Sequence, residues 1–159
     1  MKKKALCLIA CLAMLCGSAA AETEVLLPGS SYRLTIPDGM QYSEPREGDN
    51  GTYAWYSDRL EIDYVRTPKM QLFDPGDERT LQRLAEIRTD AGIDVEIREI
   101  NGIGMLVSWV TDEADGTPGI AYLFFDGNWA EEVFFWYAGQ EEAEMTAEIM
   151  MSIRETNEK

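Results

Sequence analysis

From residue 32 onward, the chain alternates apolar and polar positions in short runs, which is typical of β-strands. Turns that contain glycine, asparagine, aspartate or proline separate these runs, and several of the turns are only two or three residues long. Strands joined by such short turns are expected to pair antiparallel. The predicted strands are residues 32–36, 53–57, 60–66, 95–100, 103–110, 120–125 and Trp129–Tyr137.

Two longer segments have the spacing of helices. In residues 77–91, leucine and isoleucine recur with helical periodicity, Asp77 is the expected cap and Gly92 the expected stop. Residues 140–154 form the second predicted helix, because its acids gather at the N-terminal end, where the helix dipole favours them. The order β-β-β-α-β-β-β-β-α predicts an α+β domain with a single antiparallel sheet of about six to seven strands covered by two helices.

The stretch FFDGNWAEEVFFWY, residues 124–137, holds seven aromatic residues around one Asp-Gly pair, a sequence that predicts a hairpin. Both faces of its second strand are apolar over residues 133–137, so we expect this part at the sheet centre under helices. Glu131 and Glu132 lie nearer the turn, so that end is expected to be open to solvent. The candidate contact surface is therefore the tip: Asp126, Asn128 and Trp129.

The N-terminus has the pattern of a secretory signal peptide. Lysines at positions 2–4 precede an apolar run over residues 5–15, and small residues follow in an A-x-A pattern that ends at Ala21, where we expect cleavage. The apolar run is shorter than the roughly 20 residues that span a bilayer, so the mature chain has no predicted transmembrane segment. Retention as an anchor and lipidation at Cys11, within a lipobox-like sequence, are the weaker alternatives. The expected location is secreted or extracytoplasmic.

These boundaries divide the chain into four parts. They are a signal peptide at 1–21, a lead-in segment at 22–31, the domain at 32–155 and a C-terminal tail at 156–159.

Cleavage removes all three cysteines, and the chain has no histidine. A Ser-His-Asp triad, a cysteine nucleophile and a histidine or cysteine metal site are therefore excluded in the mature chain. No nucleophile-elbow, dinucleotide-binding or Walker-type sequence is present either. We predict that the protein is not an enzyme and assign no catalytic residue; only carboxylate chemistry of the glycosidase kind stays open.

Three of the 14 basic residues lie in the signal peptide, so the mature chain carries 11 basic and 29 acidic residues, a net charge of −18. Such a surface repels nucleic acid and anionic lipid, and it favours solubility, cationic partners or divalent cations. We expect a monomer that binds a protein or a cell-envelope component, and no nucleic acid.

Calcium is the cation that oxygen-rich turns suit best. Asp112, Glu113 and Asp115 place three carboxylates in one turn and form the candidate cation corner. Their spacing does not match the EF-hand loop, and acids of a solvated turn are the simpler interpretation. We therefore expect no cofactor, with calcium as the alternative.

Several sequence segments resemble the PsbP-like superfamily, which is named after the extrinsic PsbP subunit of photosystem II and includes many exported bacterial domains. They are YRLTIPDGM (32–40), LEIDYVRT (60–67), EINGIGMLVSWV (99–110), AYLFFDGNWAEEVFFWY (121–137) and IMMSI (149–153). The resemblance covers nearly all of the mature chain and rests on structural motifs, so it transfers no catalytic residue. It implies an α/β/α sandwich and a non-enzymatic accessory or binding role, without implying photosynthesis.

Three hypotheses about function follow. The first is an exported binding or accessory module, the second is a calcium-binding module that uses its acidic loops, and the third is a small carboxylate-dependent hydrolase.

Overall fold

The computed structural model describes residues 21–46 and 51–156, and it contains the predicted strands and helices in the predicted order, together with several short additional elements. Its strands are β1 (Glu22–Leu26), β2 (Tyr32–Pro37), β3 (Gln41–Ser43), β4 (Tyr53–Tyr56), β5 (Leu60–Pro68), β6 (Asp94–Ile100), β7 (Ile103–Thr111), β8 (Pro118–Asp126), β9 (Trp129–Tyr137) and β10 (Arg154–Glu155). Its helices are the 3-10 turn η1 (Lys69–Leu72), α2 (Leu81–Asp90) and α3 (Gln140–Met151). The predicted signal peptide lies outside the described residues except for Ala21, and so does Cys11.

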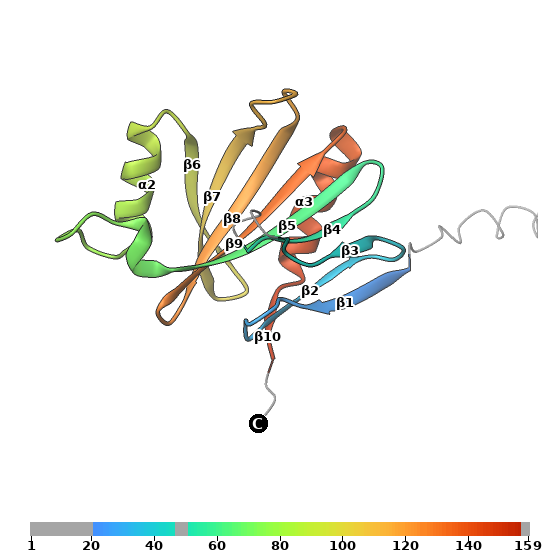
Figure 1. The fold of residues 1–159 in the computed structure, drawn as a ribbon, viewed down its shortest axis with the longest axis horizontal. Helices are drawn as coiled ribbons and strands as arrows, with labels where there is room; N and C mark the ends of the chain where they lie inside the picture. Colours follow the sequence, from blue (N-terminus) through green and yellow to red (C-terminus); the bar gives the residue numbers. More distant parts are fainter. Residues whose placement is uncertain (1–20, 47–50, 157–159) are drawn as a thin grey trace, which may run out of the picture.

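The strands form a large sheet and a small one. The large sheet has the order β3-β4-β5-β9-β8-β7-β6, and every neighbouring pair is antiparallel (Figure 1). The small sheet has the order β1-β2-β10 and is also antiparallel. The α+β class with an antiparallel sheet and two helices is therefore confirmed, and the small sheet is an addition to it.

The large sheet consists of two meanders that meet at one seam. β3, β4 and β5 follow one another in the first meander, and β6 to β9 do so in the second. β5 then pairs with β9 along nine residues, from Leu60 opposite Tyr137 to Pro68 opposite Trp129. The aromatic strand β9 is thus a central strand, as the apolar character of both its faces predicted.

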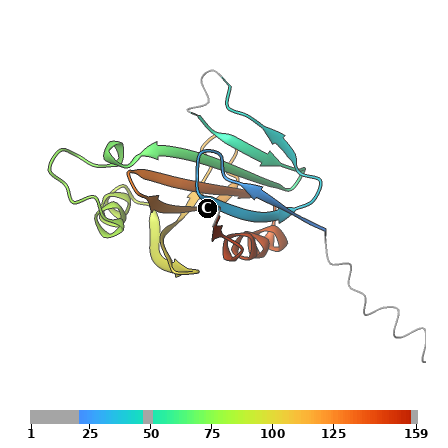
Figure 2. The same ribbon diagram turned by 90° about the horizontal axis from the view of Figure 1, so that it is seen from below.

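One face of the large sheet is covered by the small sheet and α3. Figure 2 shows α3 beside the strands of the small sheet, with which it packs. Their apolar side chains meet those of β5, β7, β8 and β9 in the main core. The members contributed by the covering layer are Leu27, Leu34, Ile36, Ile149, Met150 and Ile153.

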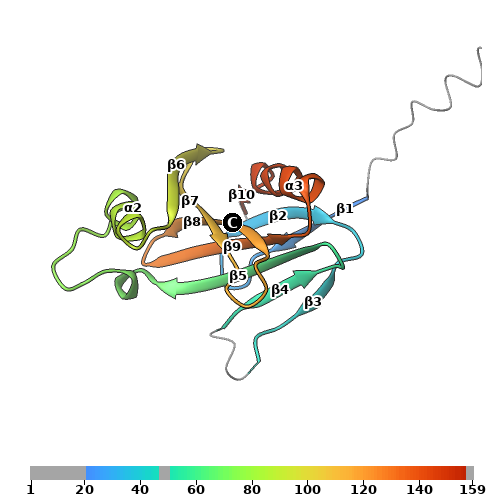
Figure 3. The same ribbon diagram turned by 90° about the horizontal axis from the view of Figure 1, so that it is seen from above.

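The opposite face is covered only in part. Leu84 and Ala85 of α2 pack on Leu106, Leu123 and Ala130, at the end of the sheet that β6, β7 and β8 form. Figure 3 shows α2 at this end of the sheet, and α3 beside β2, away from β3 and β4. α2 therefore does not cover the half of this face that β4, β5 and β9 form.

Several short elements were not predicted. Residues 22–31, predicted as a lead-in segment, contribute β1, which pairs with β2 along its five residues. β3 and β10 have three and two residues, too few to produce a readable alternation. In the predicted tail, Thr156 donates to the carbonyl oxygen of Ser31 from its backbone nitrogen at 2.7 Å and from Oγ1 at 2.8 Å, and residues 157–159 lie outside the described part.

Both helices are shorter than predicted. α2 begins after Thr80, whose Oγ1 accepts a hydrogen bond from the backbone nitrogen of Arg83 at 3.1 Å. The prediction that Asp77 caps this helix is wrong, because its carboxylate binds the Arg83 guanidinium at 3.0 Å instead. α3 ends at Met151, where the Asn101 amide donates to the Met151 carbonyl oxygen at 2.8 Å. No helix in residues 21–46 and 51–156 is long and apolar enough to cross a membrane.

Replacing Thr80 with alanine should lower the free energy of unfolding by about 1 kcal/mol, because the first turn of α2 loses its side-chain acceptor. Thr80→Ser keeps the hydroxyl and is the matched control, with an expected change below about 0.5 kcal/mol. Urea denaturation followed by circular dichroism measures both. Equal losses in the two variants would contradict this role of Thr80.

Candidate functional site

The predicted contact residues lie together at the β8–β9 turn, where the chain itself already binds them. The Asp126 carboxylate accepts a hydrogen bond from the Ser31 hydroxyl at 3.3 Å. The backbone carbonyl oxygen of Asn128 accepts one from the backbone nitrogen of Lys69 at 2.8 Å. The Trp129 ring lies 4.4 Å from the guanidinium carbon of Arg66 and is still 37% exposed. The tip thus contacts β5, η1 and the β1–β2 turn, while the side chains of Asn128 and Trp129 are still exposed.

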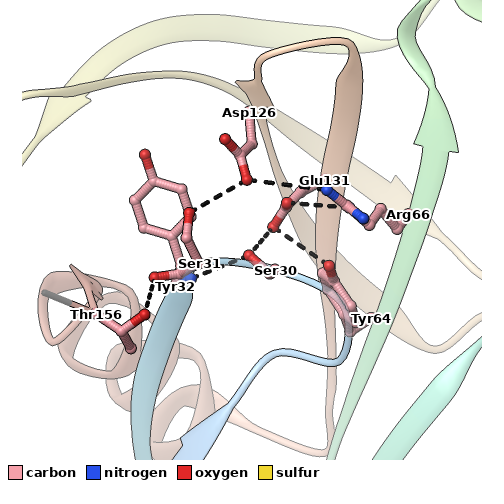
Figure 4. A network of polar contacts seen from close by, with 8 residues as sticks. All are labelled: Ser30, Ser31, Tyr32, Tyr64, Arg66, Asp126, Glu131 and Thr156. Atoms are coloured by element: carbon pink, nitrogen blue, oxygen red, sulfur yellow. Dashed lines mark hydrogen bonds and ion pairs between the residues drawn. The ribbon is translucent and has the colours of Figure 1, made fainter. Parts of the chain in front are cut away.

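Next to this tip, Glu131 lies at the centre of a buried polar network (Figure 4). Its side chain is 0% exposed, although the sequence predicted a solvated position. The Ser30 hydroxyl donates to Oε2 at 2.5 Å and the Tyr64 hydroxyl at 3.2 Å, while Arg66 Nε lies 3.4 Å from Oε1. The prediction was wrong because these three partners from distant segments replace water around the carboxylate.

The β1–β2 turn is shaped to reach this carboxylate. Gly29 has a φ of +76°, a conformation that side chains disfavour, and a β-carbon there would lie 3.4 Å from Arg66 Nη1. The turn therefore brings Ser30 over Glu131 while the guanidinium passes beside the glycine.

Burial raises the pKa of Glu131, and the nearby charge of Asp126 acts in the same direction. Hydrogen bonds from Ser30 and Tyr64 and the charge of Arg66 oppose this change but do not cancel it. Burial likewise raises the pKa of Tyr64, with the charge of Glu131 as the second cause. The network therefore retains a proton on Glu131 to a higher pH than an exposed glutamate would.

The next residue, Glu132, makes a second ion pair on the opposite face of the sheet. Its Oε1 lies 2.7 Å from Nη2 of Arg88 in α2, and Arg88 Nη1 donates to the Ser108 hydroxyl at 2.8 Å. Burial raises the pKa of Glu132 against the effect of the Arg88 charge. This contact fastens α2 to the centre of the sheet.

Beyond α2, the same face carries a group of aromatic and acidic side chains that are half-buried except for the exposed Glu61, and we call this group the open face. Phe134 and Trp136 stack with their centroids 6.1 Å apart and their planes 7° apart, and both are half-buried. Trp136 Nε1 donates to Asp63 Oδ2 at 3.0 Å, and its ring lies against the backbone of Gly119. The open face is made of Tyr56, Glu61, Asp63, Phe134 and Trp136, which the pairing of β4, β5 and β9 puts on one side.

Two carboxylates give the open face its charge. Glu61 and Asp63 alternate along β5, so their side chains lie on the same side of the sheet. Burial raises the pKa of both carboxyl groups, and the charge of Asp63 raises that of Glu61 further, whereas the Trp136 hydrogen bond acts against the shift in Asp63. A shallow groove of about 530 Å³ runs beside them, and its other lining residues are Ser43, Arg46, Thr52, Ala54 and Tyr56.

The candidate cation corner is a hydrogen-bonded turn between β7 and β8. Asp112 accepts from the backbone nitrogen of Ala114 at 2.6 Å, and Asp115 accepts from that of Thr117 at 2.8 Å, while Glu113 is exposed. The bonds from Thr117 lower the pKa of Asp115. Within the described parts of the chain, no three or more acidic, histidine or cysteine side chains come together to hold a metal ion. Calcium binding at this corner stays a prediction.

Sequence reasoning missed the open face because it expected helices on both sides of β9. The only signal for this surface in the sequence was that Glu61 and Asp63 lie two positions apart in one predicted strand, and that Phe134 and Trp136 lie two positions apart in another. Only the pairing register of these strands brings the two patterns to one place.

No family model matches this chain, and no curated protein matches it either. Among solved structures, the cyanobacterial PsbP (CyanoP) of Synechocystis sp. PCC 6803 matches with a TM-score of 0.56 at 12% identity, over 88% of this chain and 96% of that one. The chain has a PsbP-like fold. A crystal structure from Bacteroides thetaiotaomicron VPI-5482 matches with a TM-score of 0.57 at 16% identity, over 85% of this chain. This chain spans about half of that structure's length, with 48% covered. The resemblance found in the sequence is thus confirmed for the fold.

Gly119→Ala should disturb the open face and lower the free energy of unfolding by about 1–3 kcal/mol. Its new β-carbon would lie 2.6 Å from Cε3 and 2.8 Å from Cζ3 of Trp136, and 3.0 Å from the carbonyl oxygen of Phe135. Gly104→Ala is the matched control in a strand, since its β-carbon meets only Leu81 Cδ1, at 3.5 Å. Guanidinium denaturation and near-ultraviolet circular dichroism measure both variants. A change below about 0.5 kcal/mol for both would show that Trp136 does not pack as described.

Glu131→Gln should change the pH dependence of stability. Because the folded-state pKa of Glu131 is raised, its contribution to stability is fully present below the ordinary glutamate pKa and is lost as the pH rises through the folded value. The difference in free energy of unfolding should therefore move in favour of the variant as the pH rises from about 4. Urea denaturation over a pH series measures this difference, and exposed Glu113→Gln corrects for the loss of one charge. A difference that is constant, or that moves toward the wild type, would contradict the raised pKa.

Proposed function

We propose that this chain is an exported, non-catalytic binding or accessory module that contacts its partner through the open face. The observation that carries the proposal is the stacked Phe134–Trp136 pair, which lies half-exposed near the centre of the large sheet. Aromatic side chains in such a position offer a large apolar contact area at a small entropic cost. The Asp63 hydrogen bond holds the Trp136 ring in place before any partner arrives.

Two observations favour binding over hydrolysis. Glu61 and Asp63 are neighbours on one strand, whereas a glycosidase needs two carboxyl groups on opposite sides of its substrate. Glu131 and Asp126 are another pair of nearby acids, and Glu131 is completely enclosed by the chain. These arrangements support a partner-binding role for the surface acids and a structural role for the buried one.

The predicted binding surface can be tested by site-specific photo-crosslinking. The mature chain has no cysteine if cleavage follows Ala21, so a single introduced cysteine accepts a benzophenone label at one chosen place. Ala54→Cys puts the label in the groove of the open face, and Met151→Cys puts it on α3 at a residue that is 65% exposed. Both labelled proteins are illuminated in the extracytoplasmic fraction of the native cells.

We expect a discrete cross-linked product from position 54 and none from position 151. An excess of unlabelled wild-type chain should suppress the product, and an excess of a folded Trp136→Ala variant should suppress it several-fold less, because that variant lacks part of the contact area. Equal products from both positions, no product at all, or equal competition by the two unlabelled chains would overturn the proposal.

A further inference from the structure

We propose that the open face recognises a guanidinium group, carried by an arginine side chain of a protein partner, between the Asp63 and Glu61 carboxylates and the Trp136 ring. This inference rests on the proposed function, because it takes the open face as the binding surface and assigns the chemistry of its ligand.

The first argument is the charge of the open face. Asp63 and Glu61 project from alternate positions of β5, so two carboxyl groups stand side by side on a partly desolvated surface, close enough for each to influence the pKa of the other. A bound cation would reduce their repulsion and replace part of the lost hydration. The mature chain as a whole carries a net charge of −18, which attracts cationic partners and repels anionic ones over long range.

The second argument is the geometry of the aromatic group. The indole nitrogen of Trp136 donates to Asp63 Oδ2 at 3.0 Å, so one carboxylate is fixed beside the edge of a broad flat ring. A guanidinium is planar, donates two parallel hydrogen bonds to a carboxylate and stacks on aromatic rings. An ammonium group is a compact, strongly hydrated charge that cannot do both. The combination of ring and acids therefore favours arginine over lysine.

The third argument is that the same molecule already binds one of its own arginines in this way. The guanidinium carbon of Arg66 lies 4.4 Å from the centroid of the Trp129 ring, and its nitrogens lie 3.4 Å from Glu131 and 4.0 Å from Asp126. One tryptophan and two carboxylates hold that group near the hairpin turn. The open face, on the other side of β9, also combines one tryptophan, Trp136, with two carboxyl groups, those of Glu61 and Asp63.

Arg46 marks one end of the groove of the open face. It lines the groove at the end of β3, together with Glu61 and Asp63. A positive charge at that end disfavours a second guanidinium there, so the arginine of a partner should enter from the side of the half-buried Trp136 ring.

The test uses a defined probe, acetyl-tetra-arginine amide, with acetyl-tetra-lysine amide as its chemical control. The full mature chain labelled with nitrogen-15 is titrated with each peptide, and the indole resonance of Trp136 reports binding at the open face. We expect a saturable shift of this resonance with the arginine peptide and about threefold to tenfold weaker binding of the lysine peptide.

Two variants and one control separate site binding from general attraction. Asp63→Asn should weaken binding of the arginine peptide about tenfold and Glu61→Gln by a few-fold, because each removes one charged acceptor. Glu148→Gln removes the charge of an exposed glutamate on α3, on the other side of the sheet, and should leave the affinity unchanged. Nitrogen-15 spectra of each variant establish that the fold is kept.

Equal weakening by Asp63→Asn and Glu148→Gln would show nonspecific attraction and would overturn the inference, as would equal affinity for the two peptides. A tryptophan resonance that does not move would overturn it too. These results would contradict arginine recognition without contradicting the proposal that the open face binds a partner. If position 54 still cross-links to a partner and unlabelled Asp63→Asn competes as well as the wild type, the open face binds a partner by other chemistry.

Discussion

The pairing of β5 with β9 is the constraint on which the rest of this structure depends. It joins two meanders that are each built from neighbouring hairpins, and it brings residues 60–68 against residues 129–137. The buried network and the open face each include a cross-strand pair of this seam. Arg66 is directly opposite Glu131 on one face, and Asp63 is opposite Phe134 on the other. Without this register, the buried network and the open face would not form, although every individual strand would still be favoured by its own alternation.

The two adjacent glutamates in the middle of the aromatic hairpin show how the layers are attached to the seam. Successive side chains in a strand point to opposite faces, so Glu131 meets Arg66 and the β1–β2 turn while Glu132 meets Arg88 of α2. Buried ion pairs contribute little net stability when compared with apolar contacts, because both charges lose their hydration. Removing one partner leaves the other charge unpaired, however, so such pairs select one arrangement of the layers over others. We therefore interpret these acids as fixing where the small sheet and α2 sit.

Much of the fold could be predicted from the sequence because alternation, turn residues and helical spacing are local signals. Seven strands and two helices were placed within a few residues, whereas β3 and β10 are too short for any periodic pattern. The first turn of α2 was misplaced because Asp77 and Thr80 are both good caps, and the choice between them depends on the Arg83 side chain. The burial of Glu131 was missed for a different reason. Its partners Ser30, Tyr64 and Arg66 are 65 or more residues away, and the hydrophobic pattern of one strand contains no information about them.

The open face has a geometric origin that also explains its composition. α2 has ten residues, so it is about 15 Å long and about 10 Å wide, while seven strands at a spacing of about 4.8 Å extend over roughly 29 Å. One helix of this size cannot cover the face, and α3 is used on the other side. The central strand β9 therefore leaves Phe134 and Trp136 only half-buried, at a place where a larger domain would bury them. An uncovered aromatic pair promotes nonspecific association unless charged groups surround it. Glu61 and Asp63 supply that charge, and the partner that we propose for this face is therefore one that brings a cation.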